Sequence, residues 1–153
     1  MVHFLQFELA QERLTHWYEH EKEDLLKGMW ILATYQYPDL EYTQLSNKIE
    51  HLYREIWTQM GPDLLPFDQI KTINSMLFEK YKFRANTKNF HAPGNSMINN
   101  LLESLKGNPI SLSALYLLIT QKLGLPIFGV NLPNLFVLTY KTEKLQFYIL
   151  SLI

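Results

Sequence analysis

The sequence predicts an α+β fold in which helices come first and a small antiparallel sheet comes last. Apolar residues recur with helical spacing through the first two-thirds of the chain. From Ile127 onward the apolar period changes to two, which is typical of strands. The 153 residues can bury a core without a disulfide, and the sequence contains no cysteine to form one.

The first half of the chain predicts two long helices. One runs from Glu8 to about Tyr35, with the charged stretch 19–24 as a solvated face, and Pro38 ends it. The other covers about 41–60 and ends at Gly61. Its apolar side chains form one stripe: Leu45, Ile49, Leu52, Tyr53, Ile56 and Met60.

The middle of the chain predicts two shorter helices around a loop. One begins near Asp68, a suitable N-cap, and the span 82–95 reads as the loop. The next helix opens at Asn95-Ser96. Inward-facing residues of the two helices are Ile70, Ile73, Leu77 and Tyr81, followed by Met97, Ile98, Leu101, Leu102 and Leu105.

A helix over 109–123 is apolar on several faces, which predicts a buried central helix. Pro109 suits its first turn, and Gly124 is a natural stop. The predicted strands are Ile127–Val130, Leu135–Tyr140 and Leu145–Leu150. We divide the chain into a helical N-terminal region, 1–92, and a core, 93–153, packed as one unit. Because the chain stops just after an apolar strand, we expect truncation at the C-terminus.

Charge and hydropathy exclude some functions. The chain has 14 basic and 15 acidic residues, a net charge of −1, so we expect no nucleic-acid partner. It has no apolar run of 18 residues and no basic, apolar leader at its start, so we expect no membrane association and a cytoplasmic location.

Four stretches carry short motifs in a fixed order. They are Tyr37-Pro38-Asp39-Leu40, the span 73–86 with Leu77-Phe78-Glu79, the span 96–126 with Gly107-Asn108-Pro109, and Phe128-Gly129-Val130-Asn131-Leu132-Pro133. Together they resemble the bacterial transglutaminase-like superfamily, in the members usually followed by tetratricopeptide repeats. The resemblance covers roughly residues 25–150 and implies a transglutaminase-like, or papain-like, core.

The resemblance also implies where a catalytic triad would stand. In such enzymes a cysteine begins the central helix, and a histidine and an aspartate on the following strands assist it. The cysteine position falls around Pro109, with Ser111 close by, while the histidine and aspartate positions are Leu135 and Leu150. A leucine side chain can neither move a proton nor orient an imidazole. The resemblance therefore implies the fold without its chemistry.

Two functional hypotheses follow. The favoured one is a catalytically inactive domain without cofactor that binds an unidentified protein or regulates it, and that forms a homo-oligomer through an exposed last strand. The alternative is a hydrolase or acyltransferase with a rebuilt site near Ser111, using His91 and Asn134. A central pocket filled by Leu135, Phe136 and Leu150 would favour the first, and an open polar cleft would favour the second.

A separate pattern concerns metal binding. His16-Trp17-Tyr18-Glu19-His20 matches the His-x-x-Glu-His spacing of some zinc peptidases, in which both histidines share a helix face. No third ligand is evident. We therefore expect a solvated helix face with at most adventitious metal binding at His16 and His20.

Overall fold

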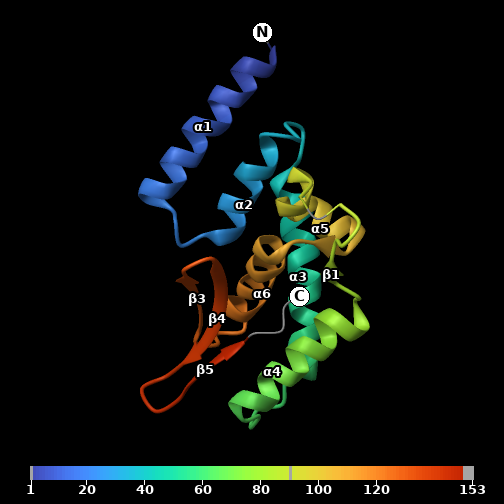
Figure 1. Cartoon of the computed structure of the whole chain (residues 1–153), viewed down its shortest axis with the longest axis vertical. Helices are drawn as coiled ribbons and strands as arrows, with labels where there is room; N and C mark the ends of the chain where they lie inside the picture. Colours follow the sequence, from blue (N-terminus) through green and yellow to red (C-terminus); the bar gives the residue numbers. More distant parts are fainter. Residues whose placement is uncertain (1, 90, 150–153) are drawn as a thin grey trace.

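The computed structural model describes residues 2–89 and 91–149 and has the predicted α+β class (Figure 1). Its principal helices are α1 (Val2–His20), α2 (Leu25–Thr34), α3 (Tyr42–Gln59), α4 (Pro66–Asn74), α5 (Ile98–Ser104) and α6 (Pro109–Lys122). Its strands are β1 (Arg84–Ala85), β2 (Lys106–Gly107), β3 (Ile127–Leu132), β4 (Leu135–Lys141) and β5 (Gln146–Ile149).

The single helix predicted over 8–35 is wrong, because two helices meet there at a sharp bend. The bend spans 21–24, the stretch that we interpreted as a solvated helix face. Asp24 caps α2 by accepting a hydrogen bond from the backbone N–H of Lys27. The Trp17 indole donates to the Asp24 carbonyl at 2.8 Å and packs against Gly28, where any side chain would collide with the indole. Figure 1 shows α1 projecting beyond the rest of the molecule.

The helix predicted over 41–60 is confirmed as α3, and its stripe faces the core. The next helix begins three residues earlier than predicted. Leu65, not Asp68, is at the N-cap of α4, and Pro66 occupies the first turn, where its missing N–H costs no hydrogen bond. Asp68 lies in that first turn, next to the positive end of the helix. The chain then continues as a π-helix, Ser75–Lys80.

The span 82–95 is mostly loop, as predicted, but it contains an unpredicted strand. β1 pairs in parallel with β2, joining Arg84 to Lys106 and Ala85 to Gly107. The helix predicted from Asn95-Ser96 begins later, because residues 93–96 form a 3₁₀ turn and α5 starts at Ile98. The Asn95 side-chain amide donates to the Asn89 carbonyl in the loop, and the Ser96 hydroxyl accepts a hydrogen bond from the Asn108 side chain, so neither residue caps α5.

The buried central helix is confirmed as α6, which lies between α3 and the sheet (Figure 1). Gly124, at φ +72°, follows its C-terminus as predicted. The sheet has the order β3-β4-β5 with antiparallel pairing, so β5 is an edge strand in the part of the chain that the structure describes. The inner face of the sheet also contacts α4, because the ring of Phe147 stacks on that of Phe67 at 4.4 Å.

A single hydrophobic core includes residues from both sides of the boundary that we placed at 92/93. It joins Leu26, Ile49 and Ile73 to Leu101, Tyr116 and Leu138, all nearly inaccessible to solvent. No helix in the described part of the chain is both long and apolar enough to cross a bilayer.

Candidate functional site

The start of α6 is held by a reciprocal cap. The Asn108 side chain accepts a hydrogen bond from the backbone N–H of Ser111 at 2.9 Å, and the Ser111 hydroxyl accepts one from the backbone N–H of Asn108 at 3.1 Å. This capping box satisfies N–H groups that have no partner within the helix. Pro109, the predicted cysteine position, fills the first turn and carries no reactive group.

The Ser111 hydroxyl is fully buried and already engaged. Its relative exposure is 0%, and its Oγ donates to the backbone carbonyl of Asn95 at 2.6 Å. A hydroxyl has one proton to donate, so this bond uses it. Gly107 allows the approach, since a Cβ there would collide with the Ser111 oxygen. The hydroxyl therefore joins α6 to the loop before α5.

Asparagine side chains extend this polar cluster into the loop. The Asn86 amide donates to the Asn95 side-chain oxygen at 3.0 Å, and the backbone N–H of Asn86 donates to the Gly107 carbonyl at 2.8 Å. The Asn108 amide donates to the Ser96 hydroxyl at 2.7 Å. Asn86 and Asn95 were not predicted as site residues. Their signal was the concentration of asparagine between residues 86 and 100.

A pocket of about 350 Å³ opens beside the cap. Its polar lining comes from His91, Ser96 and Asn108, and its apolar lining is Ala92, Pro93, Pro109 and Ile110. Neither Ser111 nor any residue of the sheet lines it. This pocket therefore does not lie between the helix start and the hairpin, and it does not decide between the two hypotheses.

Leu135, the predicted histidine position, begins β4 and is 53% exposed. It follows a tight turn in which Asn134 adopts a left-handed conformation, φ 62°, that asparagine tolerates well. Asn134 is thus explained as a turn residue. Phe136 is also exposed, and its ring covers Gly129, where a side chain would collide with it. Leu150, the predicted aspartate position, lies outside the described residues.

The register of the sheet places several large apolar side chains on the face directed away from α6. Leu132 pairs with Leu135, and Phe128 pairs with Thr139, which in turn pairs with Tyr148. Paired residues share a face of the sheet. We call the exposed side chains on this face the outer sheet patch: Phe128, Leu132, Leu135 and Tyr148.

Hydrogen bonds join the stretches that carry the family resemblance. The Asn100 amide donates to the Tyr37 hydroxyl at 2.9 Å, and the Tyr116 hydroxyl of α6 donates to the Asn74 side chain at 2.9 Å. Residues far apart in sequence therefore meet around α6. The chain also matches the transglutaminase-like superfamily over residues 43–150.

The chain belongs to the transglutaminase-like superfamily. Among curated proteins it is 30% identical to a UPF0162 protein of Xylella fastidiosa over 122 residues, which are 77% of this chain and 42% of that relative. It is 28% identical to a UPF0162 protein of Pasteurella multocida over 100 residues, 65% of this chain and 38% of that relative.

A third similarity is to the mouse F-box only protein 21, with 34% identity over 71 residues, 46% of this chain and 11% of that protein. The chain thus spans less than half the length of the UPF0162 relatives and a small part of the mouse protein. No solved structure matches it.

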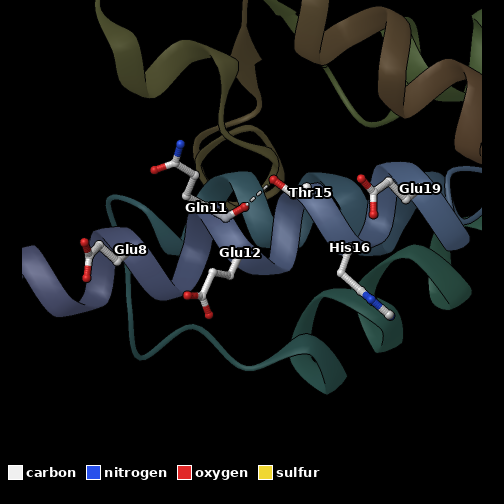
Figure 2. A pocket seen from close by; sticks show the side chains of 6 residues that line it. All are labelled: Glu8, Gln11, Glu12, Thr15, His16 and Glu19. Carbon is white, nitrogen blue, oxygen red and sulfur yellow. Dashed lines mark hydrogen bonds between the residues drawn. The ribbon is translucent and has the colours of Figure 1, made fainter.

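The His-x-x-Glu-His stretch lies on exposed α1. The His16 and His20 rings stack with centroids 4.5 Å apart, and His16 and Glu19 point to different sides of the helix (Figure 2). The adjacent hollow is formed by one helix alone, with Glu8, Gln11, Glu12, Thr15, His16 and Glu19. Within the described residues, no group of three or more His, Asp or Glu side chains is arranged to hold a metal ion.

Proposed function

We propose that this chain is a catalytically inactive transglutaminase-like domain, of the type followed by tetratricopeptide repeats, that acts as a protein-binding module. The observation that carries the proposal is the buried, hydrogen-bonded Ser111 hydroxyl at the helix start where the family presents its nucleophile. With no cysteine in the sequence and a leucine at position 135, the helix start supports packing instead of covalent chemistry.

The alternative, a rebuilt hydrolase or acyltransferase site, requires a nucleophile that substrate can reach. The Ser111 oxygen is enclosed, and attacking a substrate would require breaking both the capping box and the bond to Asn95. His91 and Ser96 line the neighbouring pocket, whereas Ser111 does not. This arrangement argues against Ser111 as a nucleophile.

The outer sheet patch supports a binding role. Its four residues are large and apolar, two of them are aromatic, and all stand on a regular, hydrogen-bonded sheet. Clustered exposed apolar side chains mark interaction surfaces, and aromatic residues are enriched at interface centres. Leu135 lies within the patch, so the position at which the family places its histidine would belong to the binding surface.

The relatives support a modular role. A stretch similar to part of this chain lies within a mouse protein named as an F-box protein, of which it makes up only 11%. The bacterial relatives carry the similar region within a longer chain as well. We infer that the domain presents a surface inside larger proteins that differ in their other parts.

The test compares two exposed leucines in the full-length protein from its native host. Leu135→Asp places a charge in the outer sheet patch, and Leu65→Asp is the matched control at the start of α4, where the leucine is 68% exposed. Leu135→Asp should keep the wild-type unfolding midpoint, and Leu65→Asp should keep or raise it, because aspartate is a favourable N-cap residue. Quantitative affinity purification should show a specific protein whose recovery falls at least about tenfold with Leu135→Asp and not with Leu65→Asp. Equal recovery with all three proteins would contradict the proposal.

The exposed edge strand gives a second, independent test of association. Within the described residues β5 pairs only with β4, so its outer backbone groups can pair with another copy. Light scattering should detect self-association that rises with concentration. A strict monomer at high concentration would exclude a homo-oligomer formed through this strand.

A further inference from the structure

Two apolar surfaces of the described chain are left uncovered, and the first is the outer sheet patch. β4 carries apolar residues in consecutive positions, Leu135-Phe136-Val137-Leu138, whereas a strand with one solvated face alternates apolar and polar residues. Continuous apolar runs are typical of strands that are covered on both faces. α6 covers the inner face, while the side chains of the outer sheet patch remain about half exposed. The sequence of β4 therefore suits a second layer on the outer face.

The second uncovered surface is on the projecting part of α1. This helix lies outside the residues that match the family, 43–150, and packs against α2 (Figure 1). Leu5 and Leu9 are one turn apart, so they share a face of the helix, and Phe4 extends the apolar surface on the first turn. The exposed fractions are 61% for Phe4, 59% for Leu5 and 46% for Leu9. The buried Ala10 marks the side that faces α2, so this apolar surface has no neighbour among the described elements.

The two surfaces match in size. A helix with its side chains is about 10–12 Å across and strands are about 4.8 Å apart, so one helix covers a sheet of three strands. The exposed parts of the four patch side chains amount to about 400 Å², and those of Phe4, Leu5 and Leu9 to about 300 Å². Either surface alone falls short of the roughly 800 Å² that each partner buries in a stable complex. Two copies that each place α1 on the other's patch would contribute about 700 Å² of apolar surface each, which approaches that area.

The charges beside the two surfaces are opposite in sign. Glu8 and Glu12 are exposed and form an acidic row next to the apolar side chains of α1. Lys141 is the one charged side chain on the outer face of the described sheet, where it pairs with Gln146. None of these three charges forms an ion pair with a described residue. Complementary charges of this kind fix the orientation of a partner, so they favour α1 as the helix on the patch.

We propose that α1 of one copy packs on the outer sheet patch of a second copy, and that this contact is made twice in a two-fold dimer. The inference rests on the proposed function, because it takes the outer sheet patch as a protein-binding surface and names its occupant. Figure 1 shows α1 and the sheet along the same side of the molecule, so one neighbouring copy can meet both surfaces. The dimer differs from a pairing of β5 edges, since it requires α1 and leaves the edge strand unused.

Mixing two variants tests the proposal on the intact chain. Leu9→Glu places a charge on the α1 surface, Leu135→Asp places one in the patch, and Leu65→Asp is the exposed control. Sedimentation velocity should show dimers of the wild type and of the control, and dimerisation weakened at least about tenfold in each of the other two variants. An equimolar mixture of the two weakened variants should form a mixed dimer at least about tenfold more tightly than either alone, because an intact α1 then meets an intact patch. A monomeric wild type, or a mixture no tighter than its components, would overturn the proposal.

Cross-linking gives a second measurement that does not depend on weakened variants. The chain has no cysteine, so a single cysteine can be placed on either surface without background reaction. A short bis-maleimide should join a Leu9→Cys copy to a Leu135→Cys copy, and should join neither of them to a Leu65→Cys copy. Equal yields in all three mixtures, or no joined product in the first, would overturn the proposal.

The dimer and the proposed function can fail separately. If Leu9→Glu leaves self-association unchanged while Leu135→Asp still loses a specific protein in affinity purification, the dimer is overturned and the proposed function stands. If Leu135→Asp changes neither self-association nor the recovery of any protein, both are overturned.

Discussion

Replacing Ser111 with alanine removes the group that we identify as structural. The change takes away the Oγ that donates to the Asn95 carbonyl and accepts from the Asn108 N–H. Loss of a helix cap costs about 0.5–2 kcal/mol, and a buried partner left unsatisfied costs about 1–3 kcal/mol. Because these effects overlap, we expect a loss of about 2–3 kcal/mol in the free energy of unfolding.

Urea and thermal unfolding of the purified chain measure this loss. For a domain of this size, 1 kcal/mol lowers the midpoint by about 2–4 °C, so Ser111→Ala should melt roughly 5–10 °C below the wild type. Ser75→Ala, at an exposed serine, is the matched control and should change the midpoint little. A wild-type midpoint for Ser111→Ala would refute a structural role for the Ser111 hydroxyl. The hydroxyl would then be available for chemistry.

Three further changes test the packing around α6. Gly107→Ala should lower the free energy of unfolding in urea by about 1–3 kcal/mol, since the added Cβ would collide with the Ser111 hydroxyl. An unchanged free energy of unfolding would mean that the cap is looser than described. Lys122→Gln should lower the melting midpoint near neutral pH, because a hydrogen bond from Lys122 lowers the pKa of Glu50 in the folded state. The difference should shrink as the pH falls through the ordinary glutamate pKa of about 4.3, and it should vanish only below the lowered pKa of the folded state, where Glu50 is protonated in both states. A difference that persists at still lower pH would contradict this cause. Burial raises the pKa of Tyr116, so the hydroxyl stays protonated to a higher pH in the folded state than in the unfolded state. The stability advantage of the wild type over Tyr116→Phe should therefore shrink as the pH rises above about 10. An advantage that stays constant with pH would contradict this role of burial.

The helices that the sequence predicted best are α3 and α6. Both have a long apolar pattern and clear stop residues, so periodicity alone defines them. The bend at 21–24 was not predicted because its charged residues also suit a helix. It depends on contacts across the bend, namely the Trp17 bond to Asp24 and the Lys27 ion pair with Glu21 at 2.7 Å.

The short elements could not be predicted from local sequence. β1 and β2 have two residues each and exist only because distant segments pair beside α6. The π-helix over 75–80 likewise has no local pattern, and its last turn is closed by a bond from Tyr81 N–H to the Met76 carbonyl. Such features follow from tertiary packing, which overrides weak propensity.

The candidate site, like the fold, could be predicted from the sequence only in part. The sequence itself shows that cysteine is absent, and the resemblance to the family's motifs places Leu135 at the histidine position. The burial of Ser111 and the bonds of Asn86 and Asn95 were not, because they depend on how the loop folds against α6. Exposure of Leu135 was also not expected, since alternation along β4 does not say which neighbours cover each end of the strand.

Covalent labelling tests the central claim, catalytic inactivity, most directly. The full-length protein is incubated with a fluorophosphonate probe, and labelled peptides are mapped by mass spectrometry. We predict no labelling of Ser111, whose oxygen is buried and hydrogen-bonded, and none of Ser96 in the neighbouring pocket above the level of other exposed serines. Selective, stoichiometric modification of either serine would contradict the account and identify an active nucleophile.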